Sequence, residues 1–172
     1  MHYVYCPVCS GLLAQSVVCL ICTKCSYEVY DNPRPSVGLI LVNDDKKILL
    51  LKRAKDPRKG IWDIPGGFID KGETLEGSVK REIFEELGIT LEKYNYIRSY
   101  SDTYIYQGVT LPILTAIFYS HVPNTININL DGENSEYTFF SFKEIPFDNF
   151  GFSSLSAAVQ DFVNSIHKAF DV

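Results

Sequence analysis

Three glutamates in one short stretch of the sequence have the spacing of a binding site for a divalent cation. Glu82, Glu85 and Glu86 stand at positions i, i+3 and i+4, so on a helix, at about 100° per residue, they share one arc. Hard cations such as Mg²⁺ bind carboxylate oxygens and usually share them with substrate phosphates. The spacing therefore predicts a site for Mg²⁺ or Mn²⁺ that acts on a phosphate-containing substrate.

The helix that carries these glutamates has negative charges where they lower its stability. Four apolar residues recur every four positions and predict a helix over residues 74–87, closed by a glycine. These residues are Leu75, Val79, Ile83 and Leu87, followed by Gly88. Glu85 and Glu86 fall in the last turn, at the negative end of the helix dipole, where acids are disfavoured by about 0.3–1 kcal/mol each. A solvated acidic face is the alternative, but a bound cation removes both the repulsion and the dipole penalty.

The residues before this helix predict a tight turn beside it. Gly66 and Gly67 follow Pro65, and Gly72 marks a second turn. Because Gly66 and Gly67 have no side chains, a backbone carbonyl there can reach a metal ion. We therefore include both glycines in the predicted metal site.

The spacing of this stretch resembles the Nudix box at every specified position. The matching residues are Gly67, Glu73, Arg81-Glu82-Ile83, Glu85-Glu86 and Gly88-Ile89. The resemblance implies a hydrolase that cleaves a nucleoside diphosphate linked to another moiety, X. It implies an α/β fold, the Nudix α/β/α sandwich with a mixed sheet between helices. It also implies that Glu82, Glu85 and Glu86 bind metal, while Arg81 and Glu73 form a supporting ion pair.

A further carboxylate is expected from residues 131–140, which resemble the segment before the last core strand of the family. There a glutamate six residues before an aromatic residue is often a further metal ligand or activates water, and the match selects Glu133. Glu136 is the second candidate, and two loop acids beside a turn are the structural alternative. A carboxylate must take the proton of the attacking water. We favour Glu82, with Glu133 next, and count Glu86 in the same catalytic set.

Five cysteines lie close together near the N-terminus, which in a chain expected to lack a signal peptide favours metal over disulfides. Cys6 and Cys9, then Cys22 and Cys25, form two CxxC knuckles, each followed by a small residue. Four thiolates suit tetrahedral Zn²⁺ and leave no open position for substrate, so the predicted role is structural. We expect Cys19 to be a buried thiol. Cys19 with Cys22 is an alternative second pair, and an iron–sulfur centre is an alternative to zinc.

The length of 172 residues fits one core domain and a small appendage. We expect a zinc ribbon over residues 1–30, a linker over 31–35 and a Nudix hydrolase domain over 36–172. A net charge of −5 argues against a non-specific nucleic-acid binder, which needs a basic face. No apolar run reaches the roughly 20 residues of a membrane span, and the N-terminus lacks a signal-peptide pattern. We therefore expect a cytoplasmic protein with no membrane or nucleic-acid partner.

Alternating and continuous apolar runs predict the elements that position the site. We expect strands at residues 36–42, 47–53 and 110–121, an exposed strand at 124–129, and an amphipathic helix at 156–170 that closes the sheet.

Three further residues are candidates for substrate binding. Arg53 ends the second of these strands and could contact a phosphate or make a surface ion pair. Tyr104 and Tyr106 could stack on a base, as aromatic faces do for about 1–3 kcal/mol, or pack on neighbouring strands.

The order of ribbon, linker and hairpin resembles the NADH pyrophosphatase branch of the family, and other ribbon-bearing relatives act on FAD or ADP-ribose. The array typical of the NADH enzymes is replaced here by SYSDTYIYQG, so X stays open among ADP-ribose, FAD, NADH and dinucleotides. The alternatives are a nucleotide-sensing regulatory protein on the same fold and an interaction module held by zinc. Many such relatives are dimers, so a homodimer that binds a small nucleotide is one option.

Overall fold

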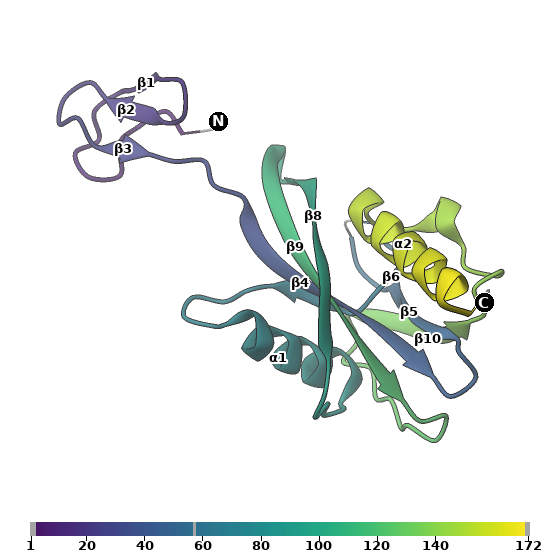
Figure 1. Cartoon of the computed structure of the whole chain (residues 1–172). Coiled ribbons are helices and arrows are strands. Elements are labelled where there is room, and N and C mark those ends of the chain that lie inside the picture. The colour runs from purple at the N-terminus through teal and green to yellow at the C-terminus, as the bar shows by residue number, and fades with distance from the viewer. Residues whose placement is uncertain (1–2, 57, 171–172) are drawn as a thin grey trace. The chain divides into compact units, whose positions relative to one another are not determined.

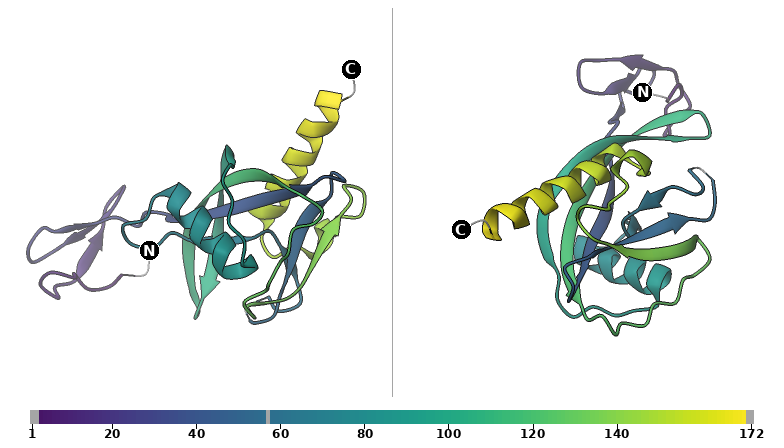
Figure 2. Two further views of the ribbon diagram at one scale, coloured as in Figure 1. Left: turned by 90° about the horizontal axis from the view of Figure 1, so that it is seen from below. Right: turned by 90° about the vertical axis from the view of Figure 1, so that its right-hand side faces the viewer.

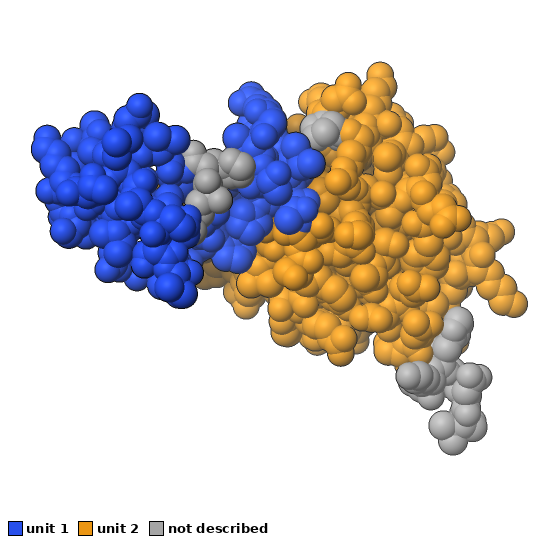
Figure 3. Space-filling model, turned by 90° about the horizontal axis from the view of Figure 1, so that it is seen from above, with its two compact units in different colours: residues 1–34, 103–112 blue, residues 35–102, 113–172 orange. Residues whose placement is uncertain are grey.

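The structure is a computed structural model that describes residues 3–56 and 58–170, with side chains as far as residue 166. The predicted domain bounds at residues 1 and 172 lie outside the described residues. The chain divides into two compact units, which Figure 3 shows in different colours. Unit 1 comprises Met1–Arg34 and Thr103–Pro112, and unit 2 comprises Pro35–Asp102 and Ile113–Val172.

Unit 1 contains a small three-stranded antiparallel sheet in the order β1-β2-β3. Its strands are β1 (Leu13–Gln15), β2 (Leu20–Cys22) and β3 (Glu28–Val29). Strands of two or three residues bury little apolar surface, so a sheet of this size needs a metal or another constraint to hold it. Its most buried side chains include Cys6, Cys19 and Cys22.

Unit 2 contains most of a seven-stranded sheet (Figure 1), apart from Arg34 and the strand residues within 103–112, which are counted with unit 1. Its main strands lie in the order β10-β5-β4-β9-β8, with β7 paired to β4 and β6 paired to β5. The bounds are β4 Arg34–Asn43, β5 Ile48–Arg53, β6 Trp62–Asp63, β7 Gly66–Phe68, β8 Asn95–Tyr106, β9 Val109–Val122 and β10 Asn134–Phe140. β5 runs antiparallel to β4, β6 and β10. The neighbours β4 and β9 run in the same direction (Figure 1), so the sheet is mixed.

Two helices cover the two faces of this sheet, which confirms the predicted α/β/α sandwich (Figures 1 and 2). They are α1 (Leu75–Leu87) and α2 (Ser153–Phe170), and the short 3-10 helix η1 (Phe147–Asn149) precedes α2. Leu39 and Leu41 of β4 pack in one core cluster with Ile83 of α1, whereas Ile40 packs in the other with Val159 of α2. Each fully buried side chain of this size contributes about 1.5–3 kcal/mol, so alternation along the strand holds one helix on each face.

Helix α1 has a capping group at each end, within one residue of the predicted bounds. Oγ1 of Thr74 accepts a hydrogen bond from the N–H of Gly77 at 3.1 Å. Gly88 takes the left-handed conformation, with φ +67°, and its N–H donates to the carbonyl of Phe84 at 2.9 Å. These local contacts fix where the helix starts and stops, and hence the arc on which its glutamates lie.

Residues 124–129, predicted as an exposed strand, form no strand. Their alternation marks burial instead, because Ile128 belongs to the core cluster beside α1 and Ile126 packs against that cluster. The N–H of Asn129 donates to the carbonyl of Leu87 at the end of α1. The prediction was wrong because alternating polar and apolar residues indicate that one side of a segment is buried, and do not indicate that the segment pairs with a strand.

No helix in the described ranges combines the length and the apolar content that crossing a membrane requires.

Candidate metal and active site

Gly66 and Gly67 of β7 lie directly against neighbouring groups that leave no room for a side chain. Gly66 has φ +145°, and a Cβ there would overlap the carbonyl oxygen of Val37 in β4. A Cβ on Gly67 would overlap the carboxylate of Glu82 in α1. The two glycines therefore let the backbone of β7 approach both the sheet and the acidic helix.

Glu86 meets the glycine turn from the last turn of α1. Its Oε2 accepts a hydrogen bond from the N–H of Gly66 at 2.9 Å, and its Oε1 accepts one from Nδ2 of Asn134 at 3.4 Å. Burial, together with the nearby charge of Glu82, raises the pKa of Glu86 to about 8 in spite of these two hydrogen bonds. A nearby cation would reverse this effect, because it stabilises the ionised form.

Arg81 joins the helix to the loop that precedes it. Its Nε and Nη2 donate to Glu73 at 2.8 and 2.9 Å, and its Nη1 donates to Glu82 at 2.8 Å and to Glu85 at 3.0 Å. Nη2 also donates to the carbonyl of Phe68 in β7 at 2.9 Å. The hydrogen bonds from Arg81 lower the pKa of Glu73 to about 2. The structure thus places the predicted Arg81–Glu73 ion pair where it fixes the loop on the helix.

The three box glutamates (Glu82, Glu85 and Glu86) differ in burial and direction. The Glu82 side chain is 13% exposed and that of Glu85 is 54% exposed. Burial raises the pKa of Glu82 even though Arg81 donates to it. Within the described ranges, the box glutamates do not form a group of ligand atoms close enough to share one ion. Arg81 draws Glu82 and Glu85 towards itself, while Glu86 faces Gly66.

The charge and chemistry of this site nevertheless fit a divalent cation. Glu73, Glu82 and Glu85 share the guanidinium of Arg81, and the negative charge of Glu82 also acts on Glu86. Carboxylate oxygens are the donors that Mg²⁺ and Mn²⁺ prefer. A cation at the glycine turn would offset the excess negative charge that burial otherwise makes costly.

The further predicted acids and the predicted arginine lie around β5 and β10. Glu133 is 65% exposed and pairs with Lys55 at 3.6 Å, whereas Glu136 is 51% exposed and pairs with Lys52 at 3.2 Å. Both acids therefore form ion pairs with lysines and do not join the box glutamates in one cluster of carboxylates. Arg53 ends β5, in register with the first residue of β10.

The two predicted stacking tyrosines belong to unit 1. Tyr104 and Tyr106 stack on each other, with ring centroids 6.1 Å apart and planes 15° from parallel. They present aromatic faces of the kind that a base could stack on.

Two buried polar residues beside the site were not predicted. Asn134 is 7% exposed and follows Glu133 directly, so its only signal in the sequence was this position. Asp63 is 6% exposed, and its Oδ1 accepts a hydrogen bond from the N–H of Ile64 at 3.0 Å. Burial raises the pKa of Asp63 to about 7. The available signal in the sequence was the position of Asp63 between Trp62 and Ile64, because an acid within an apolar run indicates a buried polar residue.

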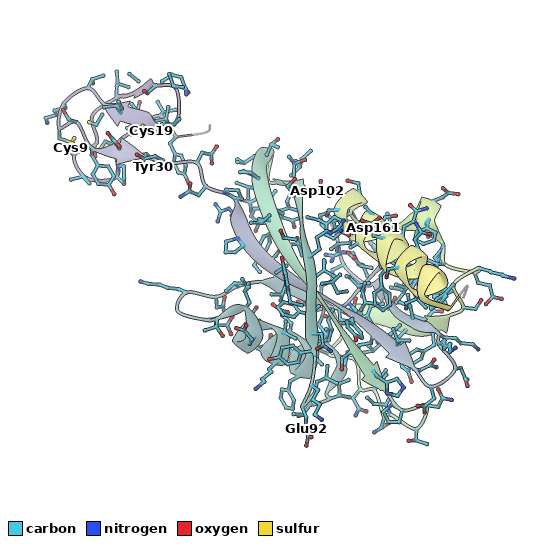
Figure 4. All side chains as sticks on the ribbon, viewed as in Figure 1. Cys9, Cys19, Tyr30, Glu92, Asp102 and Asp161 are labelled. Atoms are coloured by element: carbon cyan, nitrogen blue, oxygen red, sulfur yellow. The ribbon has the colours of Figure 1, made fainter. Side chains whose placement is uncertain are left out.

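Cys6, Cys9, Cys22 and Cys25 of unit 1 form a compact cluster. Their sulfur atoms all lie within 4.8 Å of one another, with three pairs at 3.3, 3.5 and 3.7 Å. Sulfurs around a tetrahedral Zn²⁺, at about 2.3 Å from the metal, lie about 3.8 Å apart, so the cluster fits this ion. Cys19 is buried and lies outside the cluster (Figure 4). The structure therefore groups Cys22 with Cys25, the second pair that we preferred.

The small residue after each cysteine pair has a backbone role. Ser10 and Ser26 take left-handed conformations, with φ of 56° and 60°, and their N–H groups donate to the carbonyls of Cys6 and Cys22. Burial raises the pKa of Cys22, but the backbone N–H groups of Cys25 and Lys24, together with hydrogen bonds from the thiols of Cys9 and Cys25, outweigh this effect and bring it down to about 6. They favour the thiolate, which is the form that binds metal.

Comparison with known families agrees with this arrangement. The sequence model described as the NUDIX domain matches residues 32–157. The chain belongs to the Nudix family. The matched region includes β7, α1 and β10, so the glycine turn, the box glutamates and Asn134 all lie within the Nudix domain.

The alignment with each named Nudix relative covers only part of that relative's length. An ADP-ribose pyrophosphatase from Methanocaldococcus jannaschii is 43% identical over 75 residues, which is 44% of this chain and 44% of that one. A NAD-capped RNA hydrolase, NudC, from Photobacterium profundum is 34% identical over 97 residues, or 55% of this chain and 36% of that one. The chain thus spans less than half the length of these relatives.

One solved Nudix structure matches nearly the whole chain. The crystal structure of a NUDIX hydrolase from Nitrosomonas europaea aligns with a TM-score of 0.71 and 25% identity, and covers 96% of this chain and 93% of that one. The likeness therefore extends beyond the box to the order of the strands and helices.

Proposed function

We propose that the protein is a metal-dependent pyrophosphohydrolase that cleaves a nucleoside diphosphate linked to X, releasing a nucleoside monophosphate and phosphorylated X. The observation that carries this proposal is the approach of Glu82 and Glu86 to the turn formed by Gly66 and Gly67. Buried carboxylates in excess of nearby cations are costly on their own. They have a physical purpose if a divalent cation and substrate phosphates complete the site.

The box glutamates would hold one to three Mg²⁺ or Mn²⁺ ions, together with the carbonyl of Gly66 or Gly67 and with Glu133. When bound, such ions neutralise phosphate oxygens and lower the pKa of a bound water. Arg81 holds the carboxylates of Glu82 and Glu85, and its ion pair with Glu73 keeps the guanidinium itself in place. The loop and the helix therefore present their carboxylates as one unit.

Glu82 is our candidate for the group that takes the proton from the attacking water. Burial raises its pKa, which makes it a better proton acceptor, and Arg81 fixes its orientation. Glu133 is the second candidate, although it is exposed and would have to leave its ion pair with Lys55 to act. Glu86, held by Gly66, completes the catalytic set.

The four clustered cysteines would hold a structural Zn²⁺. Cys6, Cys9, Cys22 and Cys25 supply four sulfurs, which leaves no position for a substrate. The short strands of the ribbon bury too little apolar surface to fold without such a constraint. We therefore assign the ion a role in folding and none in the reaction.

The substrate class is proposed from the chemistry that the names of two relatives share. ADP-ribose and the NAD cap both contain ADP joined through its pyrophosphate to another group. We accordingly propose ADP linked to X, with ADP-ribose, FAD, NADH and dinucleotides as candidates. Arg53 would bind phosphate, and Tyr104 or Tyr106 would stack on the base. A net charge of −5 favours a free nucleotide over a nucleic acid. We place the activity in the cytoplasm, carried out by a monomer or a homodimer.

Hydrolysis of these candidate substrates in the presence of Mg²⁺ or Mn²⁺, with product analysis, tests the proposal. Glu82→Gln and Glu86→Gln should each lower kcat by about 10²–10⁴-fold, the range for a lost general base. Glu92→Gln is the matched control, because Glu92 is an exposed glutamate in the same unit (Figure 4). Undiminished turnover in both box variants would refute the assigned roles. Tight nucleotide binding without turnover in the wild-type protein would favour a sensor instead.

A further inference from the structure

A β-bulge at the start of β10 lies beside the acidic helix. β10 pairs antiparallel with β5, and Asn134 lies opposite Arg53 while Glu136 lies opposite Lys52, the next residue along β5. Ser135 is therefore the extra residue, and its hydroxyl donates to the carbonyl of Lys52 at 3.2 Å. Bulges change the direction of a side chain relative to the regular alternation and are common next to active sites.

The side chain at this bulge reaches the last turn of α1. Asn134 is 7% exposed, and its Nδ2 donates to Oε1 of Glu86 at 3.4 Å. The other carboxylate oxygen, Oε2, accepts from the N–H of Gly66 at 2.9 Å. Glu86 is therefore held on one side by β7 and on the other by β10.

The donors that hold Glu86 are different in kind from those that hold the other box glutamates. Glu82 and Glu85 accept hydrogen bonds from the positive guanidinium of Arg81. Glu86 accepts hydrogen bonds from a backbone amide and a side-chain amide, both without net charge. Neutral donors fix the direction of a carboxylate and leave its negative charge available to a cation. Partners of metal-binding carboxylates commonly have this orienting role.

We infer that Asn134 is a positioning residue for the divalent-cation site. It orients the carboxylate of Glu86 and leaves the negative charge of that carboxylate available to the cation. This inference rests on the proposed function, because it requires Glu86 to be a metal ligand. It adds a residue from β10 to a site otherwise built from β7 and α1.

Mn²⁺ binding to the zinc-loaded protein, measured without substrate from the electron paramagnetic resonance signal of free Mn²⁺, tests the inference. Asn134→Ala should raise the Mn²⁺ Kd by about 10–100-fold, the usual loss for such a partner. In hydrolysis assays, most of the lost kcat should return at saturating Mn²⁺, whereas the KM for the nucleotide should stay nearly unchanged. Asn134→Leu, which keeps the branched shape of the side chain and lacks the donor, should behave alike and serves if the alanine variant does not fold.

Asn43→Ala is the matched control. Asn43 is also 7% exposed and in unit 2, but its Oδ1 accepts from the N–H of Lys47 in the turn between β4 and β5. This variant should lose thermal stability and keep its Mn²⁺ Kd within about twofold. Folded Asn134 variants that bind Mn²⁺ as tightly as the wild type would overturn the inference.

Glu86→Gln separates this inference from the proposed function. If Glu86→Gln binds Mn²⁺ normally, the proposed metal site itself is wrong. If Glu86→Gln weakens binding and Asn134→Ala does not, only the role of Asn134 is wrong. In the Glu86→Gln background, Asn134→Ala should produce little further loss, because its partner carboxylate is already gone.

Discussion

The metal-free protein should become less stable as the pH rises from 5.5 to 8.5, and Glu86→Gln should remove much of this loss. The pKa of Glu86 is raised from an ordinary 4.5 to about 8 in the folded protein, chiefly by burial. Between these two values the folded state holds a proton that the unfolded state has released, so raising the pH favours unfolding. The stabilising contribution is therefore complete below about pH 4.5 and is lost as the pH passes through about 8.

The size of this effect follows from the same two pKa values. The difference between 4.5 and about 8 corresponds to an upper bound of about 5 kcal/mol. Because Glu86 remains partly accessible to solvent, the effective dielectric around the carboxylate is higher than in a dry interior, and the expected loss falls to about 2–3 kcal/mol. Saturating Mg²⁺ at pH 8.5 should restore stability by about 2.7 kcal/mol at 100 times its Kd.

Urea unfolding, followed by the fluorescence of Trp62, measures these changes. Trp62 is the single tryptophan of the chain and is 8% exposed in unit 2, so it reports on the Nudix core. Titrating groups that do not interact with Glu86 affect wild type and variant alike and cancel in the comparison. The charges of Glu82 and Asp63 do act on Glu86, so Glu86→Gln also relieves their repulsion and the measured difference includes that relief. Equal pH slopes for wild type and Glu86→Gln would show that the buried charge of Glu86 is not what destabilises the metal-free protein.

Three further outcomes are expected. Gly67→Ala should raise the Mg²⁺ concentration for half-maximal activity at least about tenfold, because its methyl group would displace the carboxylate of Glu82; an unchanged metal titration would contradict this contact. Arg81→Lys should lower the free energy of unfolding in urea by about 2–3 kcal/mol, since one ammonium cannot replace the several hydrogen bonds of the guanidinium. Cys22→Ser should remove bound zinc, measured by mass spectrometry, and leave the tryptophan-monitored unfolding midpoint nearly unchanged; retained zinc would refute the cysteine site.

The helix α1 and its charges could be predicted from the sequence because their determinants lie within one continuous stretch. Thr74 and Gly88 cap the helix through contacts that span three or four residues. The spacing of the box glutamates alone places them on one arc. The cysteine knuckles are local in the same way, since each pair is closed by hydrogen bonds to the small residue that follows.

The contacts that complete the site join residues far apart in the chain, and only the tertiary structure decided them. Asn134 reaches Glu86 across 48 positions, because a bulge in β10 changes its direction. The fold outside the site depends on contacts of the same kind, since Asp102 of β8 accepts from the N–H of Ser154 at the start of α2, across 52 positions. Asp102 is labelled in Figure 4. Spacing and periodicity describe only neighbours along the chain. Which strand lies beside which helix depends on how the whole sheet packs, so these partners become visible only once the chain has folded.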